Sequence, residues 1–397
     1  MTDCMVFYGQ EENFFEERAC INTAEEIARQ PGLWKELGKM LLSKKQYISD
    51  FINRLGDLRN TRIIMTGAGS SGFIGEALAG FIAKSSGIKC EAIHTTDIVA
   101  APGTVLFADI PTLLVSFGRS GNSPESTGAV QYARKTVKKL YEVAIVCDGT
   151  SKLHDITAES KDNLILVMPE GSNDKAFAMT SSVTCMLLAG YALFNSDKIE
   201  DIVNDIGRLS ENLSGGSLKL SDITRKLAKS PFDRAVYLAC GSFKGLAHEG
   251  ALKMLELSKG EVSAGFDSAT GFRHGPKAVI KDRTMSLHLI SSDPFTAKYD
   301  TDLLGEMING KNNNTIVAVT GNKANGKLAE GLKADETVLI PSDGYGFASD
   351  LCIGINALVF FQMLAMFKSL ELGITTDNPY LGGQLSRVVK NVNIYPY

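Results

Sequence analysis

Two glutamates and a lysine share one predicted helical face in the second half of the chain. Glu249, Lys253 and Glu256 are spaced i, i+4 and i+7, so on a helix their side chains lie on the same side. A carboxylate in a partly desolvated site can move a proton next to a carbonyl or an imine. The alternative is a solvated surface ion pair, which stabilises a helix by only about 0.2–0.5 kcal/mol.

A histidine follows in a predicted turn. His274 stands in Gly271-Phe-Arg-His-Gly-Pro276, between a glycine and a proline. A loop histidine with a restricted backbone is a candidate proton shuttle near neutral pH, although it could simply satisfy a hydrogen bond of the turn. The sequence contains no metal-ligand spacing, so we expect neither a metal nor another cofactor.

Two serine-rich loops in the first half are candidates for holding a phosphate. The first, Gly67-Ala-Gly-Ser-Ser-Gly72, places Ser70 and Ser71 just before a predicted helix, where hydroxyls and backbone amides bind phosphate well. The same letters fit the G-x-G-x-x-G dinucleotide fingerprint, with Glu91 about twenty residues further on. A glycine-rich turn with a purely structural role is the third interpretation.

The second loop favours the phosphate. Residues 118–125 contain one arginine and several polar side chains, namely Arg119, Ser120, Asn122 and Ser123. Ser123 before Pro124 is also an ordinary helix N-cap, but capping explains only one of these side chains. A pyrophosphate would not need a second loop, so the pair of loops fits one phosphomonoester of a small molecule.

The chain contains the same strand pattern twice. Residues 62–70 match 234–242 at an offset of 172 residues, and three further apolar runs recur at the same offset: 113–120 with 285–292, 143–149 with 315–321, and 164–169 with 336–341. Short apolar runs alternating with helical patterns predict parallel sheets covered by helices on both faces. The second copy has Ser291-Ser-Asp-Pro294 where the first has its arginine loop, and we expect it not to bind the same group.

The duplication predicts two three-layer α/β/α domains. The expected boundaries are an N-terminal helical segment at 1–57, a first domain at 58–200, a helical connector at 201–229, a second domain at 230–375 and an irregular tail at 376–397. In open parallel sheets, ligands bind outside the carboxyl ends of the strands, which is where both serine-rich loops are predicted.

Composition restricts the class of partner. The chain has 397 residues, which are too many for one core. Its 41 basic and 45 acidic residues give a net charge of −4, which argues against a nucleic-acid partner.

The sequence also indicates a compartment. The acidic start is not a secretory signal, and seven cysteines without a pairing pattern indicate reduced thiols in the cytoplasm. The longest apolar run, residues 351–367, is interrupted by Asn356 and Gln362 and is expected to form a buried helix, not a membrane span.

These motifs resemble a known family. The tandem repeat, the serine-rich phosphate loop and the series Glu249-Gly-Ala-Leu-Lys253, Glu256 and His274-Gly-Pro resemble two sugar-isomerase (SIS) domains, as in the isomerase half of glucosamine-6-phosphate synthase. Residues 119–125, 173–182, 271–277 and 291–294 are more similar to the tagatose-6-phosphate ketose/aldose isomerase subgroup, whose activity is galactosamine-6-phosphate deaminase/isomerase. The resemblance implies flavodoxin-like parallel sheets.

The resemblance also implies roles for individual residues. Glu256 would move the proton between C1 and C2 of the sugar, supported by Glu249 and Lys253. His274 would help to open the ring and would come from the neighbouring subunit, so that the protein would be at least a dimer with shared active sites. Lys390 aligns with a reactive lysine of the C-terminal tail. The phosphate would be held by the loop residues Ser70, Ser71, Arg119, Ser120 and Ser123.

The phosphate site departs from that of the synthase. Gly118 stands where the synthase has a serine, and Arg119 where it has a glutamine. The expected activity is conversion of galactosamine 6-phosphate to tagatose 6-phosphate and ammonia, without a metal. The alternatives are a plain aldose–ketose isomerase, a deglycase and a non-catalytic phosphosugar sensor. Retention of Lys253, Glu256 and His274 together argues against the sensor.

Overall fold

The computed structural model describes residues 6–342, 344–383, 386–389 and 392–397, and the chain forms two compact units. The β3 unit, named after its first strand, comprises Gly32–Asp174, Ser181–Asn204 and Gly382–Tyr397. The β8 unit comprises Met1–Pro31, Lys175–Thr180 and Asp205–Leu381. The chain therefore enters each unit more than once, and the last residues belong to the unit that contains the first sheet.

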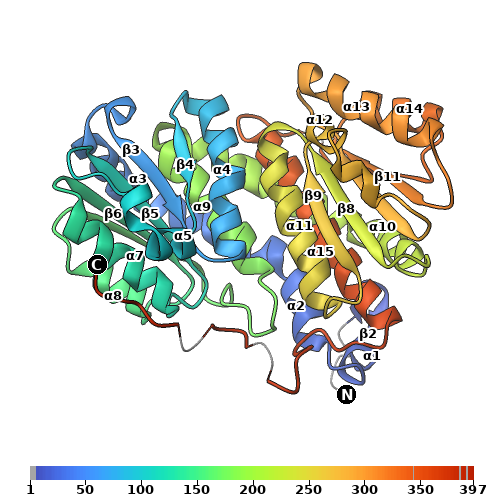
Figure 1. The fold of residues 1–397 in the computed structure, drawn as a ribbon, viewed down its shortest axis with the longest axis horizontal. Helices are drawn as coiled ribbons and strands as arrows, with labels where there is room; N and C mark the ends of the chain where they lie inside the picture. Colours follow the sequence, from blue (N-terminus) through green and yellow to red (C-terminus); the bar gives the residue numbers. More distant parts are fainter. Residues whose placement is uncertain (1–5, 343, 384–385, 390–391) are drawn as a thin grey trace. The chain divides into compact units, whose positions relative to one another are not determined.

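The β3 unit is built on a five-stranded parallel sheet (Figure 1). Its strands lie in the order β4-β3-β5-β6-β7, which is the flavodoxin-like order. The central strand β5 is buried at every residue, as expected for an apolar run covered on both faces. The strands are β3 (Arg62–Thr66), β4 (Cys90–Ala92), β5 (Thr112–Gly118), β6 (Leu140–Val146) and β7 (Asn163–Val167).

Helices cover both faces of this sheet. One layer contains α4 and α9, which pack against each other. The other contains α5, α7 and α8, whose apolar side chains meet Ile64, Leu114 and Ala144 of the sheet in one core. The helices are α3 (Gln30–Leu55), α4 (Ser70–Ser86), α5 (Thr95–Ala100), α6 (Pro102–Val105), α7 (Pro124–Thr136), α8 (Lys152–Ala158) and α9 (Ser181–Phe194), with short 3-10 turns at Leu58–Asn60 and Ser196–Lys198.

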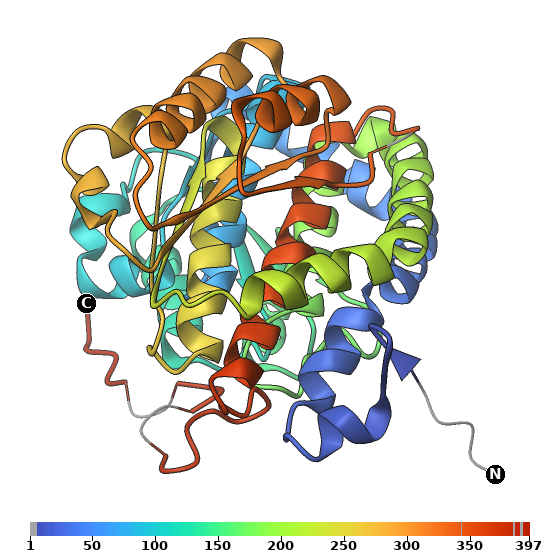
Figure 2. The same ribbon diagram turned by 90° about the vertical axis from the view of Figure 1, so that its right-hand side faces the viewer.

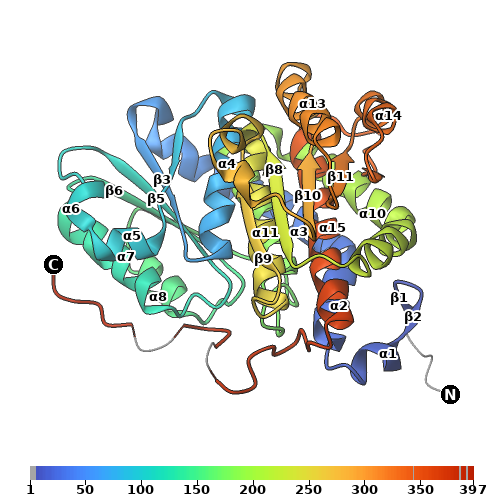
Figure 3. The ribbon, with the colours of Figure 1, turned by 45° about the vertical axis from the view of Figure 1, so that its right-hand side comes forward.

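The β8 unit repeats the same sheet. Its order, β12-β11-β10-β8-β9, is equivalent to that of the first sheet when the elements are counted from the start of each copy (Figure 3). Strands β8 and β10 begin 172 residues after β3 and β5, so the offset found in the sequence is the offset between equivalent strands. The strands are β8 (Arg234–Ala239), β9 (Ser263–Asp267), β10 (Thr284–Leu289), β11 (Thr315–Thr320) and β12 (Glu336–Leu339).

Helices α11 and α15 lie on one face of the second sheet. Figure 2 shows α15 in red beside α11 in yellow, and these helices pack closely. The opposite face carries α12, α13 and α14. The remaining elements are α1 (Glu12–Glu16), α2 (Ile21–Ala28), α10 (Ile199–Ala228), α11 (Lys244–Leu257), α12 (Ala269–Phe272), α13 (Pro294–Asn309), α14 (Lys323–Leu332), α15 (Ser349–Glu371), the hairpin β1 (Val6–Phe7) and β2 (Gln10–Glu11), and 3-10 turns at Gly241–Phe243 and Pro276–Val279.

The predicted fold is confirmed, with one strand missed in each copy. The four apolar runs of each half are four of the five strands. The missing strands, β4 and β9, lie at sheet edges, have no fully buried residue and therefore lack an apolar run. A search for apolar runs finds strands that contain buried residues, including the edge strands β7 and β12, and overlooks strands that contain none.

Helix α15 is the buried helix predicted from the longest apolar run. At 23 residues it is long and apolar enough to cross a bilayer, the one such helix among the described residues, and 94% of its most apolar stretch is buried inside the protein. Its two polar interruptions are also buried and bonded. Asn356 donates to Pro341 O at 3.0 Å, and Gln362 accepts from Gln30 at 2.9 Å. Side chains hydrogen-bonded in this way are compatible with a protein core, although Asn356 Oδ1 has no hydrogen-bond partner among the described residues.

Candidate active site

The three charged residues of α11 form a largely buried cluster in the β8 unit. Lys253 Nζ lies 3.2 Å from Glu249 Oε1 and 2.6 Å from Glu256 Oε2. The side chains of Lys253 and Glu249 are 0% and 2% exposed, whereas that of Glu256 is 26% exposed. The interpretation of this face as a solvated surface stripe is therefore wrong, and Glu256 is the member of the cluster that a substrate can reach.

The lysine remains charged in spite of its burial. Burial alone would lower the pKa of Lys253, but the charges and hydrogen bonds of Glu249 and Glu256 more than offset it, so the pKa lies above its ordinary value. A buried ammonium group beside Glu256 fixes the position of one carboxylate oxygen. This arrangement can hold a general base in one orientation.

Close helix packing produces this burial. A side chain at Gly250 would place its Cβ 2.7 Å from Phe361 on α15 and 3.0 Å from Tyr237 on β8. Only glycine allows α11 to approach these rings so closely. Tyr237 and Phe361 also contact each other edge to face, with ring centroids 4.9 Å apart.

His274 lies in an exposed turn between α12 and the 3-10 turn Pro276–Val279. Arg273 and Lys277, on either side of His274, attach this turn to α13. Arg273 Nε lies 2.6 Å from the carboxylate of Glu306, and Lys277 pairs with the same carboxylate. These cations lower the pKa of Glu306. Among the described residues the imidazole has no hydrogen-bond partner, so a turn-stabilising role for this side chain receives no support.

Tyr380 is a residue near Glu256 that the sequence analysis missed. Its ring packs on that of Phe177, with centroids 5.1 Å apart. Burial, and after it the charge of Glu256, raises the pKa of Tyr380. The tail segment that carries it is anchored by Asp377, whose carboxylate accepts the backbone N–H groups of Asn22 at 3.0 Å and Thr23 at 2.8 Å.

In the β3 unit, the first serine-rich loop begins α4. Ser70 and Ser71 are buried in the first turn of this helix. A Cβ at Gly67 would lie 2.5 Å from the backbone of Ser71, so this glycine is required by the tight turn from β3. Glu91, the acidic residue of the dinucleotide pattern, is held by Arg62 through two hydrogen bonds of 2.9 and 2.8 Å. That pairing disfavours the dinucleotide interpretation.

The second loop begins α7. Ser123 occupies the N-cap position, yet its hydroxyl bonds the hydroxyl of Ser126 at 2.6 Å and caps no backbone N–H. Asn122 orders the loops, because its Oδ1 accepts the backbone N–H of Lys152 at 3.0 Å. Ser120 is half-buried and Arg119 is only 7% exposed.

The two loops lie at the same edge of one sheet. Strands β3 and β5 are parallel neighbours, with Thr66 opposite Ser116, so the loops after them emerge side by side. The structure thus brings all six predicted phosphate residues together at the carboxyl edge of one sheet. It places Glu249, Lys253, Glu256 and His274 in the β8 unit, while Lys390 lies outside the described residues.

In the equivalent loop of the second copy, carboxylates of the protein itself accept hydrogen bonds from the loop. Asp293 caps α13 by accepting the N–H groups of Phe295 at 3.1 Å and Thr296 at 2.9 Å. The backbone N–H of Ser291 donates to Asp300 at 3.0 Å, and Ser292 donates to Asp350. A phosphate here would meet negative charge, in keeping with the expectation that this loop does not bind one.

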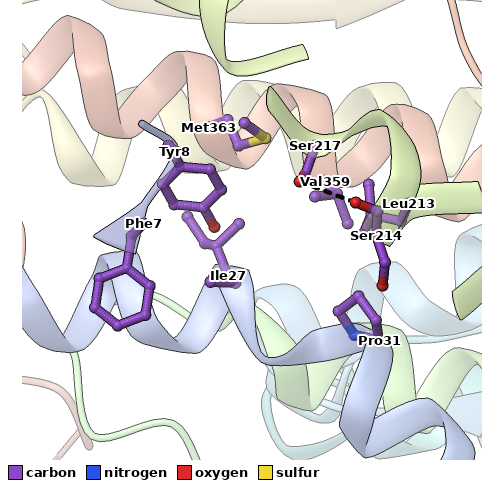
Figure 4. A pocket seen from close by; sticks show the side chains of 10 residues that line it. Phe7, Tyr8, Ile27, Pro31, Leu213, Ser214, Ser217, Val359 and Met363 are labelled. Carbon is purple, nitrogen blue, oxygen red and sulfur yellow. Dashed lines mark hydrogen bonds between the residues drawn. The ribbon is translucent and has the colours of Figure 1, made fainter. Parts of the chain in front are cut away.

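Apart from these residues, the described chain offers an apolar cavity, no metal-ligand cluster and no activated thiol at Cys147 or Cys240. A cavity of about 260 Å³ in the β8 unit is lined mainly by apolar side chains, among them Tyr8, Ile27 and Met363, and by none of the candidate residues (Figure 4). Within the described part of the chain, no three His, Cys, Asp or Glu side chains are grouped to hold a metal ion. Burial raises the pKa of Cys147 to about 12 and that of Cys240 to about 11, so neither thiol is an activated nucleophile.

Comparisons with known proteins agree with this architecture. The SIS domain family matches residues 58–196. The chain is 38% identical over 380 residues to the D-galactosamine-6-phosphate deaminase AgaS of Shewanella sp. (strain ANA-3), covering 94% of this chain and 92% of that protein. The crystal structure of the Escherichia coli tagatose-6-phosphate ketose/aldose isomerase is 34% identical with a TM-score of 0.85, covering 95% and 96% of the two chains. A lower identity, 24% over 281 residues, relates 68% of the chain to 42% of the glutamine–fructose-6-phosphate aminotransferase of Clostridium acetobutylicum.

Proposed function

The chain belongs to the AgaS family of SIS-domain proteins, and on that premise we propose that it converts galactosamine 6-phosphate and water to tagatose 6-phosphate and ammonia. The single observation that carries the proposal is the cluster on α11. It holds one partly exposed carboxylate, Glu256, 2.6 Å from a fully buried lysine. Such a group suits proton transfer at a carbon next to a carbonyl.

The proposed reaction begins with opening of the sugar ring, assisted by His274. Glu256 then takes the proton from C2, next to the C1 aldehyde, which gives an enol that still carries the amine. Return of the proton to C1 leaves an imine at C2. Water adds to this imine, and ammonia leaves to give the ketone of tagatose 6-phosphate.

Phosphate recognition is assigned to the loops of the β3 unit. The N-termini of α4 and α7 begin at these loops and favour an anion, as does the buried arginine at position 119. Ser70, Ser71, Ser120 and Ser123 add hydroxyl groups. Asn122 has the different role of joining this loop to the start of α8.

The first experiment measures ammonia release from galactosamine 6-phosphate and, in parallel, from glucosamine 6-phosphate, with chelator present. Release from the galacto epimer supports the proposal. If neither sugar yields ammonia although both bind, the deaminase assignment is wrong.

A plain isomerase is the second candidate, favoured by the similarity to the Escherichia coli ketose/aldose isomerase structure. The same proton transfer on an unsubstituted sugar would interconvert galactose 6-phosphate and tagatose 6-phosphate. Turnover of this pair in the absence of ammonia release would favour the isomerase over the deaminase.

We also propose a cytoplasmic homo-oligomer in which His274 serves the neighbouring subunit's site. The exposed imidazole without a partner supports this assignment. Co-assembly of two inactive variants, Glu256→Gln and His274→Ala, tests it. Random dimers would regain about a quarter of the wild-type sites, because half the dimers are mixed and each mixed dimer has one complete site. No regain on mixing would place His274 and Glu256 in the same subunit's site.

A further inference from the structure

Arg387, in the C-terminal tail, is held at the carboxyl edge of the sheet in the β3 unit. Its Nη2 donates to Asn173 Oδ1 at 3.0 Å and to the backbone carbonyl of Asp174. Both residues belong to the segment that follows β7. A residue near the end of the chain thereby lies beside the loop after the edge strand β7, more than two hundred residues earlier.

The same tail residue contacts the candidate phosphate loop. Arg119 Nη2 donates to the backbone carbonyl of Arg387 at 2.7 Å. Because Arg119 directly precedes Ser120, the tail is attached to the loop that opens α7. The two arginines therefore meet at one edge of the sheet.

The last residues hold the tail in place further along. Ile394 packs on α7, where a Cβ at Gly128 would lie 3.0 Å from it, and the hydroxyl of Tyr132 donates to the carbonyl of Tyr395. Figure 1 shows the end of the tail beside α7. The tail is thus fastened to α7 beyond Arg387, in addition to the contacts that Arg387 itself makes.

The guanidinium group of Arg387 is bonded to neutral acceptors. Its hydrogen-bond acceptors are an amide and a carbonyl oxygen, and no carboxylate among the described residues lies within ion-pair distance of it. The nearby carboxylate of Asp174 is occupied at the start of α9, where it accepts the N–H groups of Ser181 at 3.1 Å and Ser182 at 2.9 Å and both serine hydroxyls. The guanidinium group of Arg387 therefore carries its charge without a carboxylate partner among the described residues.

We propose that Arg387 is a further phosphate-binding residue, which pairs with Arg119 to select a dianionic phosphate monoester. The inference deepens the proposed function and rests on it for the identity of the sugar. A phosphomonoester carries about −1.5 to −2 charges at neutral pH, and the planar fork of a guanidinium group matches its oxygens. In this proposal the phosphate site contains residues of the two loops and one residue of the C-terminal tail.

Arg387→Ala tests the proposal through binding of inorganic phosphate by calorimetry and through the KM for galactosamine 6-phosphate. We expect phosphate to bind about 10- to 100-fold more weakly and KM to rise by a similar factor, with kcat nearly unchanged, because hydrogen bonds to charged groups contribute this much. Arg387→Lys keeps the charge without the fork and should recover part of the affinity.

Tyr132→Phe is the matched control, because it removes a contact of the tail and leaves its charge intact. It should bind phosphate almost as the wild type does. An unchanged affinity in Arg387→Ala overturns the proposal, and so does an equal loss in Tyr132→Phe, which would assign the effect to tail docking. Wild-type protein that binds phosphate through Arg387 but releases no ammonia would refute the proposed activity and leave this inference standing.

Discussion

The loops after β5 and β10 occupy equivalent places in two copies of one sheet and have opposite electrostatics. Both lead into a helix whose first residue is a proline, α7 at Pro124 and α13 at Pro294. In the first copy the capping residue is Ser123, which leaves the helix N-terminus uncapped by a side chain. In the second copy Asp293 caps two backbone N–H groups with its carboxylate. A serine at the N-cap leaves the N-terminus of α7 available to an anion. An aspartate at the N-cap neutralises the N-terminus of α13 with its own charge.

The first helices of the two copies, α4 and α11, also differ in the polar residues that they carry. Helix α4 presents Ser70 and Ser71 at its start, whereas α11 carries its buried charged cluster two turns into the helix. In the proposed function, the duplicated scaffold therefore carries phosphate binding in one copy and proton transfer in the other. Each difference is open to a separate test.

The largest effect is expected from Glu256→Gln. Removal of the proposed base should lower kcat by about 10²–10⁴ and lower the unfolding midpoint only slightly, because Lys253 keeps Glu249 as its ionic partner and the amide keeps the shape of the side chain. Ammonia release and a denaturant titration measure the two quantities. Glu261→Gln, an exposed glutamate of the same unit, is the control. Activity near that of the wild type would remove Glu256 from the mechanism.

Lys253→Met should lower the free energy of unfolding more than any other substitution in this comparison. It leaves Glu249 buried without its cation, and breaking a buried pair costs about 3–5 kcal/mol of the free energy of unfolding. Urea denaturation measures the loss. The double variant Lys253→Met/Glu249→Gln should recover part of it, because no unpaired buried charge remains. A single variant as stable as the wild type would contradict the ion-paired cluster.

Ser123→Asp copies the second loop into the first and tests the comparison directly. The new carboxylate should cap α7 and repel phosphate, raising the KM for the phosphosugar about 10- to 100-fold, as expected for a lost or opposed charged interaction. Asn322→Asp, at the N-cap of α14, adds the same charge elsewhere and should leave KM unchanged. An unaltered KM in Ser123→Asp would move the phosphate away from this loop.

The smallest effect concerns stability alone. Asp293→Ala should lower the free energy of unfolding by about 1 kcal/mol, because two backbone N–H groups lose their cap. Ser123→Ala should cost less than about 0.5 kcal/mol, since its hydroxyl caps none. Equal losses in thermal unfolding of the two variants would contradict the different capping of the two helices.

The sequence by itself determined the duplicated scaffold and the local chemistry. Buried strands such as β5 are continuous apolar runs, and the spacing of Glu249, Lys253 and Glu256 is a property of one helix, so both can be predicted from neighbouring residues. The same holds for the serine-rich loops, which lie next to the strands that position them.

Only the tertiary structure decided which of these residues are buried and which distant residues join them. Lys253 is fully buried because α11 packs on α15, a contact between segments about a hundred residues apart. The edge strands β4 and β9 are half-exposed and have no apolar run to reveal them. Arg387 and Tyr380 lie in a tail without helical or strand periodicity, and their places depend on contacts with Asn173 and Phe177 that leave no local pattern in the sequence.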